Sequence, residues 1–150
     1  MPDVFISYSK NNQQLAEFVH RHLKTEGVDV FMASVSLQPG QDWTEAVKQA
    51  LRGSKRVIFL ASKAACASAY VQQELGGAFF GGKTVIPVIW EVEPEALPGW
   101  MNRAQALDLR RLQSPDGFVS VLKGIAGEIR NEKLIGLGIV GAILFLLSRL

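Results

Sequence analysis

Residues 56–62 read RVIFLAS, an apolar run that no alternating polar residues interrupt. Such a run is typical of a strand that is covered on both faces, as in a parallel sheet flanked by helices. Three other segments have a similar character: DVFISYS at 3–9, VDVFM at 28–32 and TVIPVIW at 84–90. Together the four segments predict the strands of one buried sheet.

Apolar residues recur at helical spacing between these runs. The expected helices are marked by Leu15, Phe18, Val19 and Leu23, by Val47 and Leu51, by the stretch 68–82, and by Phe118, Val121, Leu122, Ile125 and Ile129. Short connections between alternating strands and helices require parallel pairing and right-handed crossovers. The sequence therefore predicts an α/β fold with an open, doubly wound parallel sheet. In such a sheet, ligands lie at the carboxyl ends of the strands.

Composition limits the possible functions. The chain has 150 residues and a net charge of +2, which indicates one compact domain and no broad basic surface for nucleic acid. The single cysteine, Cys66, cannot form an intrachain disulfide. His20 and His22 point to different sides of a predicted helix, so no metal site is expected. No apolar signal precedes the first strand, and a reducing cytosol is the expected setting of the folded part.

The stretch SAYVQQELGGAFFGG at 68–82 places one carboxylate, Glu74, among apolar and small residues. Tyr70 and Glu74 are four residues apart and therefore share one side of the predicted helix, where Gly77 leaves space. We expect Glu74 to be half-buried at the edge of an apolar stripe and close to the strand ends. A solvent-exposed glutamate on a helix surface is the alternative. The stripe expected to face the sheet consists of Val71, Leu75, Ala78 and Phe79.

Four segments resemble a Toll/interleukin-1 receptor (TIR) domain: DVFISYS, GVDVFMASVSLQPGQDW, SKRVIFLAS and SAYVQQEL. Their order and spacing match over roughly residues 3–130. The resemblance implies a flavodoxin-like sheet. It also implies one of two functions, which are cleavage of NAD+ at the nicotinamide–ribose bond and TIR–TIR assembly without chemistry.

In NAD-cleaving TIR domains, the key glutamate follows an aromatic residue by four positions, and the resemblance therefore implies that Glu74 is catalytic, with Ser68 and Tyr70 beside the substrate. Tyr70 stands where relatives often carry Trp, and no acid follows the second strand at Met32 to Ser34. Nicotinamide leaves as a neutral molecule, so the difficult step is formation of a sugar cation, which one fixed carboxylate stabilises. NAD+ would be the substrate, and no cofactor is expected.

For the further candidate site residues, the sequence allows either a structural role or contact with the ligand. Ser7 and Tyr8 belong mostly to the predicted sheet core, but backbone groups after Ser7 could meet the nucleotide. Ser68 could cap the helix instead of contacting ligand. Trp43 could close over a nucleotide base or a neighbouring subunit, or pack in the core. The resemblance implies that a loop with Gln38, Pro39 and Gly40 gates the site and mediates assembly.

Residues 134–150 read LIGLGIVGAILFLLSRL. GLGIVG at 136–141 fits the glycine pattern of dinucleotide sites, but it lacks the strand and the βαβ unit that the pattern requires. The uncharged stretch 134–148 would be about 22 Å long as a helix, whereas the hydrocarbon core is about 30 Å thick. Because it is apolar on all sides and flanked by charges, a membrane anchor is favoured over a helix–helix assembly element.

The sequence thus predicts a TIR domain at 1–131 and a hydrophobic, transmembrane helix at 132–150. The favoured function is a membrane-tethered NAD+ glycohydrolase or cyclase, with its TIR domain in the cytoplasm, that becomes active on self-association. A prokaryotic effector against phage is the expected setting. The alternative is a non-enzymatic TIR scaffold. A phospho-acceptor domain is disfavoured, because Ser7, Tyr8 and Ser9 stand where acids are needed.

Overall fold

The computed structural model describes residues 2–34, 44–101, 106–112 and 114–149, apart from the side chains at 70, 79 and 137–142. The described part contains one five-stranded sheet with the order β2-β1-β3-β4-β5, and all neighbouring strands are parallel. This order is that of flavodoxin-like folds, so the predicted doubly wound sheet is confirmed. The strands are β1 (Val4–Tyr8), β2 (Val30–Ser34), β3 (Arg56–Leu60), β4 (Thr84–Ile89) and β5 (Leu107–Asp108).

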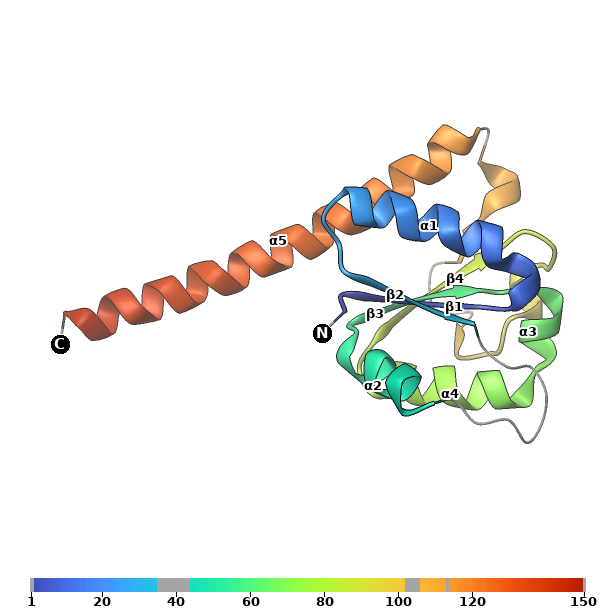
Figure 1. The fold of residues 1–150 in the computed structure, drawn as a ribbon, viewed down its shortest axis with the longest axis horizontal. Coiled ribbons are helices and arrows are strands. Elements are labelled where there is room, and N and C mark those ends of the chain that lie inside the picture. The colour runs from blue at the N-terminus through green and yellow to red at the C-terminus, as the bar shows by residue number, and fades with distance from the viewer. Residues whose placement is uncertain (1, 35–43, 102–105, 113, 150) are drawn as a thin grey trace.

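Helices cover both faces of the sheet (Figure 1). One layer consists of α1 (Gln13–Thr25) and the domain part of α5 (Pro115–Ser148), and the other of α2 (Glu45–Gly53), α3 (Lys63–Ala67) and α4 (Ala69–Phe80). Successive strand residues point to opposite faces, so Val4, Ile6 and Tyr8 pack under α1 and α5, and Phe5 packs under α2 and α4. Short 3-10 helices are η1 (Lys10–Asn12), η2 (Pro94–Ala96) and η4 (Leu109–Arg111).

The segment after β3 contains a helix that the sequence did not predict. It forms the short helix α3, because the Ser62 Oγ accepts a hydrogen bond from the backbone N–H of Ala65 at 3.1 Å. The chain then turns at Ser68 and begins α4. The helix predicted at 68–82 therefore corresponds to α4, and α3 was not predicted.

The last helix is longer than the domain and projects away from it (Figure 1). α5 runs without interruption from Pro115 to Ser148, so the predicted boundary between residues 131 and 132 falls inside a helix. Ion pairs also extend past that boundary, since Lys133 contacts Asp3 at 2.9 Å. Beyond this point large apolar side chains are exposed, with exposed fractions from 51% to 65% at Leu134, Ile135, Ile143, Leu144, Phe145, Leu146 and Leu147.

None of the helices in the described residues has the length and apolar character required to traverse a bilayer. The prediction of a transmembrane helix at 132–150 is therefore not supported. The apolar stretch between Lys133 and Arg149 is short, and the side chains at 137–142 lie outside the described residues.

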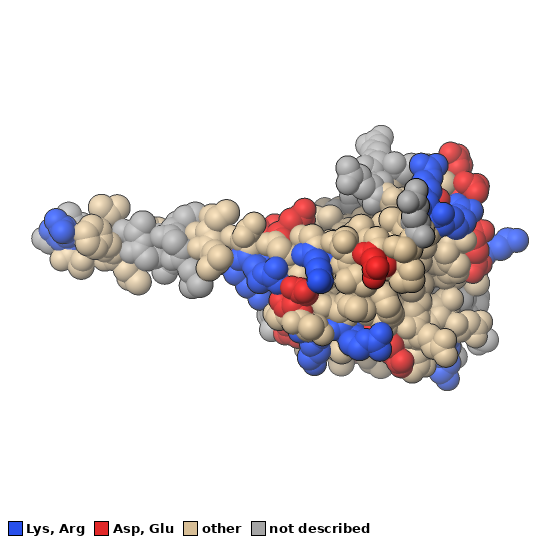
Figure 2. All heavy atoms as spheres, turned by 90° about the horizontal axis from the view of Figure 1, so that it is seen from above, with Lys and Arg blue, Asp and Glu red and all other residues tan. Residues whose placement is uncertain are grey.

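Charges of both signs alternate over the face formed by α1 and the domain part of α5 (Figure 2). Many of them form pairs, such as Arg130 with Glu26 at 3.2 Å. This face therefore presents no large area of a single charge, in agreement with the small net charge of the chain.

Candidate functional site

A groove of about 500 Å³ lies between α2 and α4. Both helices follow a strand and return along the same face of the sheet (Figure 1). On the α4 side the wall is low toward the end of the helix, where Gly77, Ala78 and the following Gly81 line it, whereas Gln73 and Glu74 and the residues of α2 contribute longer side chains. Leu51 and Ala78 are each 7% exposed and provide apolar surface in the groove. The groove is lined by Lys48, Leu51, Arg52, Gln73, Glu74, Gly77, Ala78, Gly81 and Lys83.

Glu74 lies in this groove, in the middle of α4. Val71 and Leu75 are fully buried against the sheet, as the predicted stripe requires, and Glu74 is half-buried beside them. The predicted stripe is thus confirmed at its described positions. Within the described residues, the Glu74 carboxylate has no hydrogen bond or ion pair, and it is the only acid that lines the groove. Its charge is therefore available to a ligand.

Three cations share the groove with Glu74. Lys48 and Arg52 are four residues apart on α2, so they lie on the same side of the helix. Lys83 is fixed in place, because its Nζ donates hydrogen bonds to the carbonyl oxygens of Arg52 and Ser54, each at 2.6 Å. Burial lowers the pKa of Lys83. The sequence analysis did not select these residues, although Lys48 and Arg52 directly follow the predicted core positions Val47 and Leu51.

Ser68 and Tyr70 occupy the first turn of α4. Ser68 is 9% exposed, and its Oγ accepts a hydrogen bond from the backbone N–H of Val71 at 3.3 Å. It therefore caps the helix, which is one of its two predicted roles. The side chain of Tyr70 lies outside the described residues, as do Trp43 and the predicted assembly loop of Gln38, Pro39 and Gly40.

Ser7 and Tyr8 do not join Glu74 in the groove. Tyr8 packs in the layer of α1 and α5, on the opposite face of the sheet from α4. Ser7 is fully buried, and its Oγ has no hydrogen-bond partner in the part of the chain that the structure describes. The described residues that line the groove belong to the middle and last turns of α2 and α4 and to the segment before β4. The groove therefore lies toward the amino ends of the strands, and the sequence was wrong to expect Glu74 and its ligand at their carboxyl ends.

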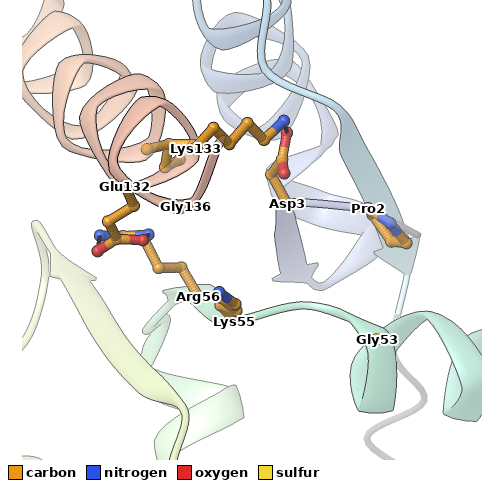
Figure 3. Close-up of a pocket in the computed structure, with 9 residues that line it drawn as sticks. Pro2, Asp3, Gly53, Lys55, Arg56, Glu132, Lys133 and Gly136 are labelled. Atoms are coloured by element: carbon orange, nitrogen blue, oxygen red, sulfur yellow. Dashed lines mark hydrogen bonds and ion pairs between the residues drawn. The ribbon is translucent and has the colours of Figure 1, made fainter. Parts of the chain in front are cut away.

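A second hollow, of about 340 Å³, lies on the amino side of the sheet, where α5 leaves the domain (Figure 3). The Arg56 guanidinium donates two hydrogen bonds to the Glu132 carboxylate, at 2.7 and 3.1 Å, and Lys133 points toward Asp3. The hydrogen bonds raise the pKa of Arg56 and lower the pKa of Glu132. Because these charges satisfy one another, the hollow fits a structural role better than a catalytic one.

Two further kinds of chemistry were considered. Among the described residues, no three His, Cys, Asp or Glu side chains gather in a way that could hold a metal ion. Cys66 is half-buried, and burial together with the nearby Glu91 charge raises the pKa of its thiol. A raised pKa disfavours the reactive thiolate, so the groove around Glu74 is the stronger candidate site.

Known proteins resemble this chain in sequence and in fold. A family model described as TIR domain matches residues 4–122. A probable 2' cyclic ADP-D-ribose synthase from Brachypodium distachyon is 25% identical over 97 residues, which are 63% of this chain and 43% of that protein. The match thus spans less than half the length of this relative.

Solved structures match over most of the chain. The TIR domain of the Toll-related receptor TRR-2 from Hydra magnipapillata is 20% identical, with a TM-score of 0.64 over 87% of this chain and 99% of the other. The TIR domains of the activated Roq1 resistosome are 19% identical, with a TM-score of 0.65 over 86% of this chain and 99% of the other. At this identity the likeness shows the fold alone.

Proposed function

The chain belongs to the TIR domain family, and on that premise we propose that it cleaves NAD+ at the nicotinamide–ribose bond with Glu74 as the catalytic carboxylate. The observation that carries the proposal is a half-buried carboxylate that lines a groove of about 500 Å³ and that no other described residue pairs with. The name of the relative from Brachypodium distachyon, a probable cyclic ADP-ribose synthase, supports the same substrate.

The reaction needs little from the enzyme at the leaving group. The bond between the ribose C1 and the pyridine nitrogen breaks, and its electron pair neutralises the cationic ring as nicotinamide leaves. The positive charge moves to the ribose, where a fixed carboxylate stabilises it. Attack of water on C1 gives ADP-ribose and releases a proton, whereas attack of a hydroxyl group from the same molecule gives a cyclic product.

Glu74→Gln tests the proposal, because it removes the charge and keeps the size of the side chain. We expect the rate of nicotinamide release, measured by chromatography, to fall by about 10²–10³-fold. Glu17→Gln, on the exposed side of α1, is the matched control and should leave the rate unchanged. A second variant, Gln73→Glu with Glu74→Gln, moves the carboxylate by one residue, and it should not restore activity if the position of the charge matters.

Two results would contradict the proposal. One is a Glu74→Gln variant that releases nicotinamide at the wild-type rate. The other is wild-type protein that releases none, even when it is concentrated enough to self-associate.

A scaffold that acts by self-association is the second candidate, and the exposed apolar side chains of α5 favour it. Burying such side chains between copies of the chain would be strongly favourable. Light scattering on the full chain and on Leu144→Asp would detect the assembly and its loss. Assembly without nicotinamide release would support the scaffold.

The proposed cellular setting rests on the resemblance to TIR domains and on the apolar composition of residues 134–148. We propose association with a membrane, a TIR domain in the cytoplasm, and defence against phage through loss of NAD+. Fractionation of cells that express the full chain tests the location. Phage challenge of cells with wild-type or Glu74→Gln protein tests the defence role.

A further inference from the structure

Two cations of the groove between α2 and α4 have no described partner. Within the described residues, Lys48 and Arg52 form no ion pair, and their side chains make no hydrogen bond. Glu74, the only acid among the described lining residues, forms no ion pair with either of them. By contrast, Arg56 and Lys133 at the exit of α5 are paired, with Glu132 at 2.7 Å and with Asp3 at 2.9 Å. The charges of the groove are therefore arranged around an open space.

The positions of these charges follow from the directions of the helices. Lys83 bonds to the carbonyl groups at the end of α2, so it marks the end of the groove toward the amino edge of the sheet. Arg52 belongs to the last turn of α2, and Lys48 lies one turn earlier, toward the carboxyl edge. Glu74 lies in the middle of α4. Among the described lining residues, Lys48 and Arg52 thus lie on the α2 side of the groove, Lys83 lies at its amino end, and Glu74 lies on the α4 side.

The total charge also suits a particular ligand. Among the described residues that line the groove, three cations and one carboxylate leave an excess of two positive charges. A pyrophosphate that links two nucleosides carries two negative charges. A row of positive charges that face a common space binds phosphate oxygens through charge-assisted hydrogen bonds.

We propose that Lys48 and Arg52 bind the pyrophosphate of the dinucleotide whose ribose lies against Glu74. The inference rests on the proposed function, and it assigns the substrate-binding role to α2, which the sequence motifs do not include. Gly77 and Gly81 provide the room, since their lack of side chains keeps the α4 wall low opposite these cations. Lys83 holds the end of α2 in place and adds its positive charge to the row.

The first experiment measures the kinetics of nicotinamide release by the full chain and by Lys48→Gln/Arg52→Gln. We expect KM for NAD+ to rise about tenfold or more with kcat changed less than threefold, because the lost contacts serve binding. Lys24→Gln/Lys123→Gln removes the same charge from exposed positions on α1 and α5, and it should leave both constants unchanged. An equal KM in the two double variants would overturn the inference, even if cleavage depends on Glu74.

The second experiment does not depend on catalysis. Calorimetry follows the binding of inorganic pyrophosphate and of ADP-ribose to Glu74→Gln, with and without the substitutions at Lys48 and Arg52. We expect the dissociation constant to increase about tenfold when both cations are replaced. If wild-type protein cleaves no NAD+ but this increase is seen, the proposed function fails and the phosphate site stands. If pyrophosphate and ADP-ribose bind with the same affinity to both proteins, the inference is wrong. Circular dichroism confirms that each variant is folded.

Discussion

Glu132→Gln tests how the long helix α5 is held where it leaves the domain. Arg56 begins β3, and its side chain is only 11% exposed, so its charge is largely removed from water. Two hydrogen bonds from its guanidinium to the Glu132 carboxylate, at 2.7 and 3.1 Å, stabilise that charge. Glutamine keeps the shape of the side chain but removes the negative charge, which leaves the cation partly uncompensated.

The free energy of unfolding that Glu132→Gln is expected to lose lies between two limits. Breaking a fully buried ion pair costs about 3–5 kcal/mol, whereas a surface pair contributes up to about 1 kcal/mol. The Glu132 side chain is 50% exposed, and Glu128 remains 3.7 Å from the same guanidinium. We therefore expect the free energy of unfolding to fall by about 1.5 kcal/mol, and the melting temperature by roughly 3–6 °C.

Urea unfolding at pH 7, followed by circular dichroism, measures the loss. Glu128→Gln is the matched control, because its side chain is 71% exposed, and it should cost less than about 0.5 kcal/mol. The reasoning is refuted if the two substitutions destabilise the protein equally.

The same pair predicts a pH dependence. The hydrogen bonds from Arg56 hold the pKa of Glu132 below its ordinary value of 4.5. The stabilisation is therefore complete above that value and is lost as the pH falls through the lower pKa of the folded state. The difference in stability between wild type and Glu132→Gln should be constant near neutral pH and shrink in acid, which urea titrations at several pH values measure. A difference that grows on acidification would contradict the assignment.

Three further predictions concern the segment around the groove. Ser68→Ala should lower the free energy of unfolding by about 1 kcal/mol through loss of the α4 cap, whereas Ser68→Asp should retain most of it, as urea unfolding measures. Gly77→Ala should raise the free energy of unfolding by about 0.5–1 kcal/mol, since the added methyl group meets no atom within 4 Å outside the local helix backbone. The same methyl group narrows the groove and should slow nicotinamide release. Gly124→Ala is the control, with a similar gain in stability and no loss of activity. Alkylation of Cys66 by iodoacetamide at pH 7 should be slower than that of a free cysteine, and Glu91→Gln should accelerate it, because Glu91 raises the pKa of the thiol.

The fold was predictable because its signals are local. Apolar runs such as 56–62 can be buried only when both faces are covered, and the alternation with helices then fixes parallel pairing. The short helix α3 escaped prediction because five residues give no helical period, and its start depends on the single cap of Ser62. The extension of α5 through residue 131 also escaped, since the change from amphipathic to fully apolar residues suggested a boundary.

The site was predictable in part. The apolar stripe of α4 placed Glu74 at its edge, and the structure confirms the half-buried position. The groove could not be derived from the sequence, because it depends on the distance between α2 and α4. These helices are separated along the chain by β3 and α3. Lys48 and Arg52 therefore looked like ordinary surface residues until both helices were in place.

The charges of the groove also restrict what can occupy it. A carboxylate that is already bound to a cation has little effect on a developing positive charge, because the nearby cation cancels its field. Among the described residues Glu74 avoids this, since Lys48 and Arg52 lie on α2 across the groove and the Lys83 ammonium donates to carbonyl oxygens at the end of α2. A simple anion would satisfy Lys48 and Arg52 but would be repelled by Glu74. The proposed substrate, NAD+, carries a positive centre and two negative groups in one molecule and would therefore meet both kinds of charge.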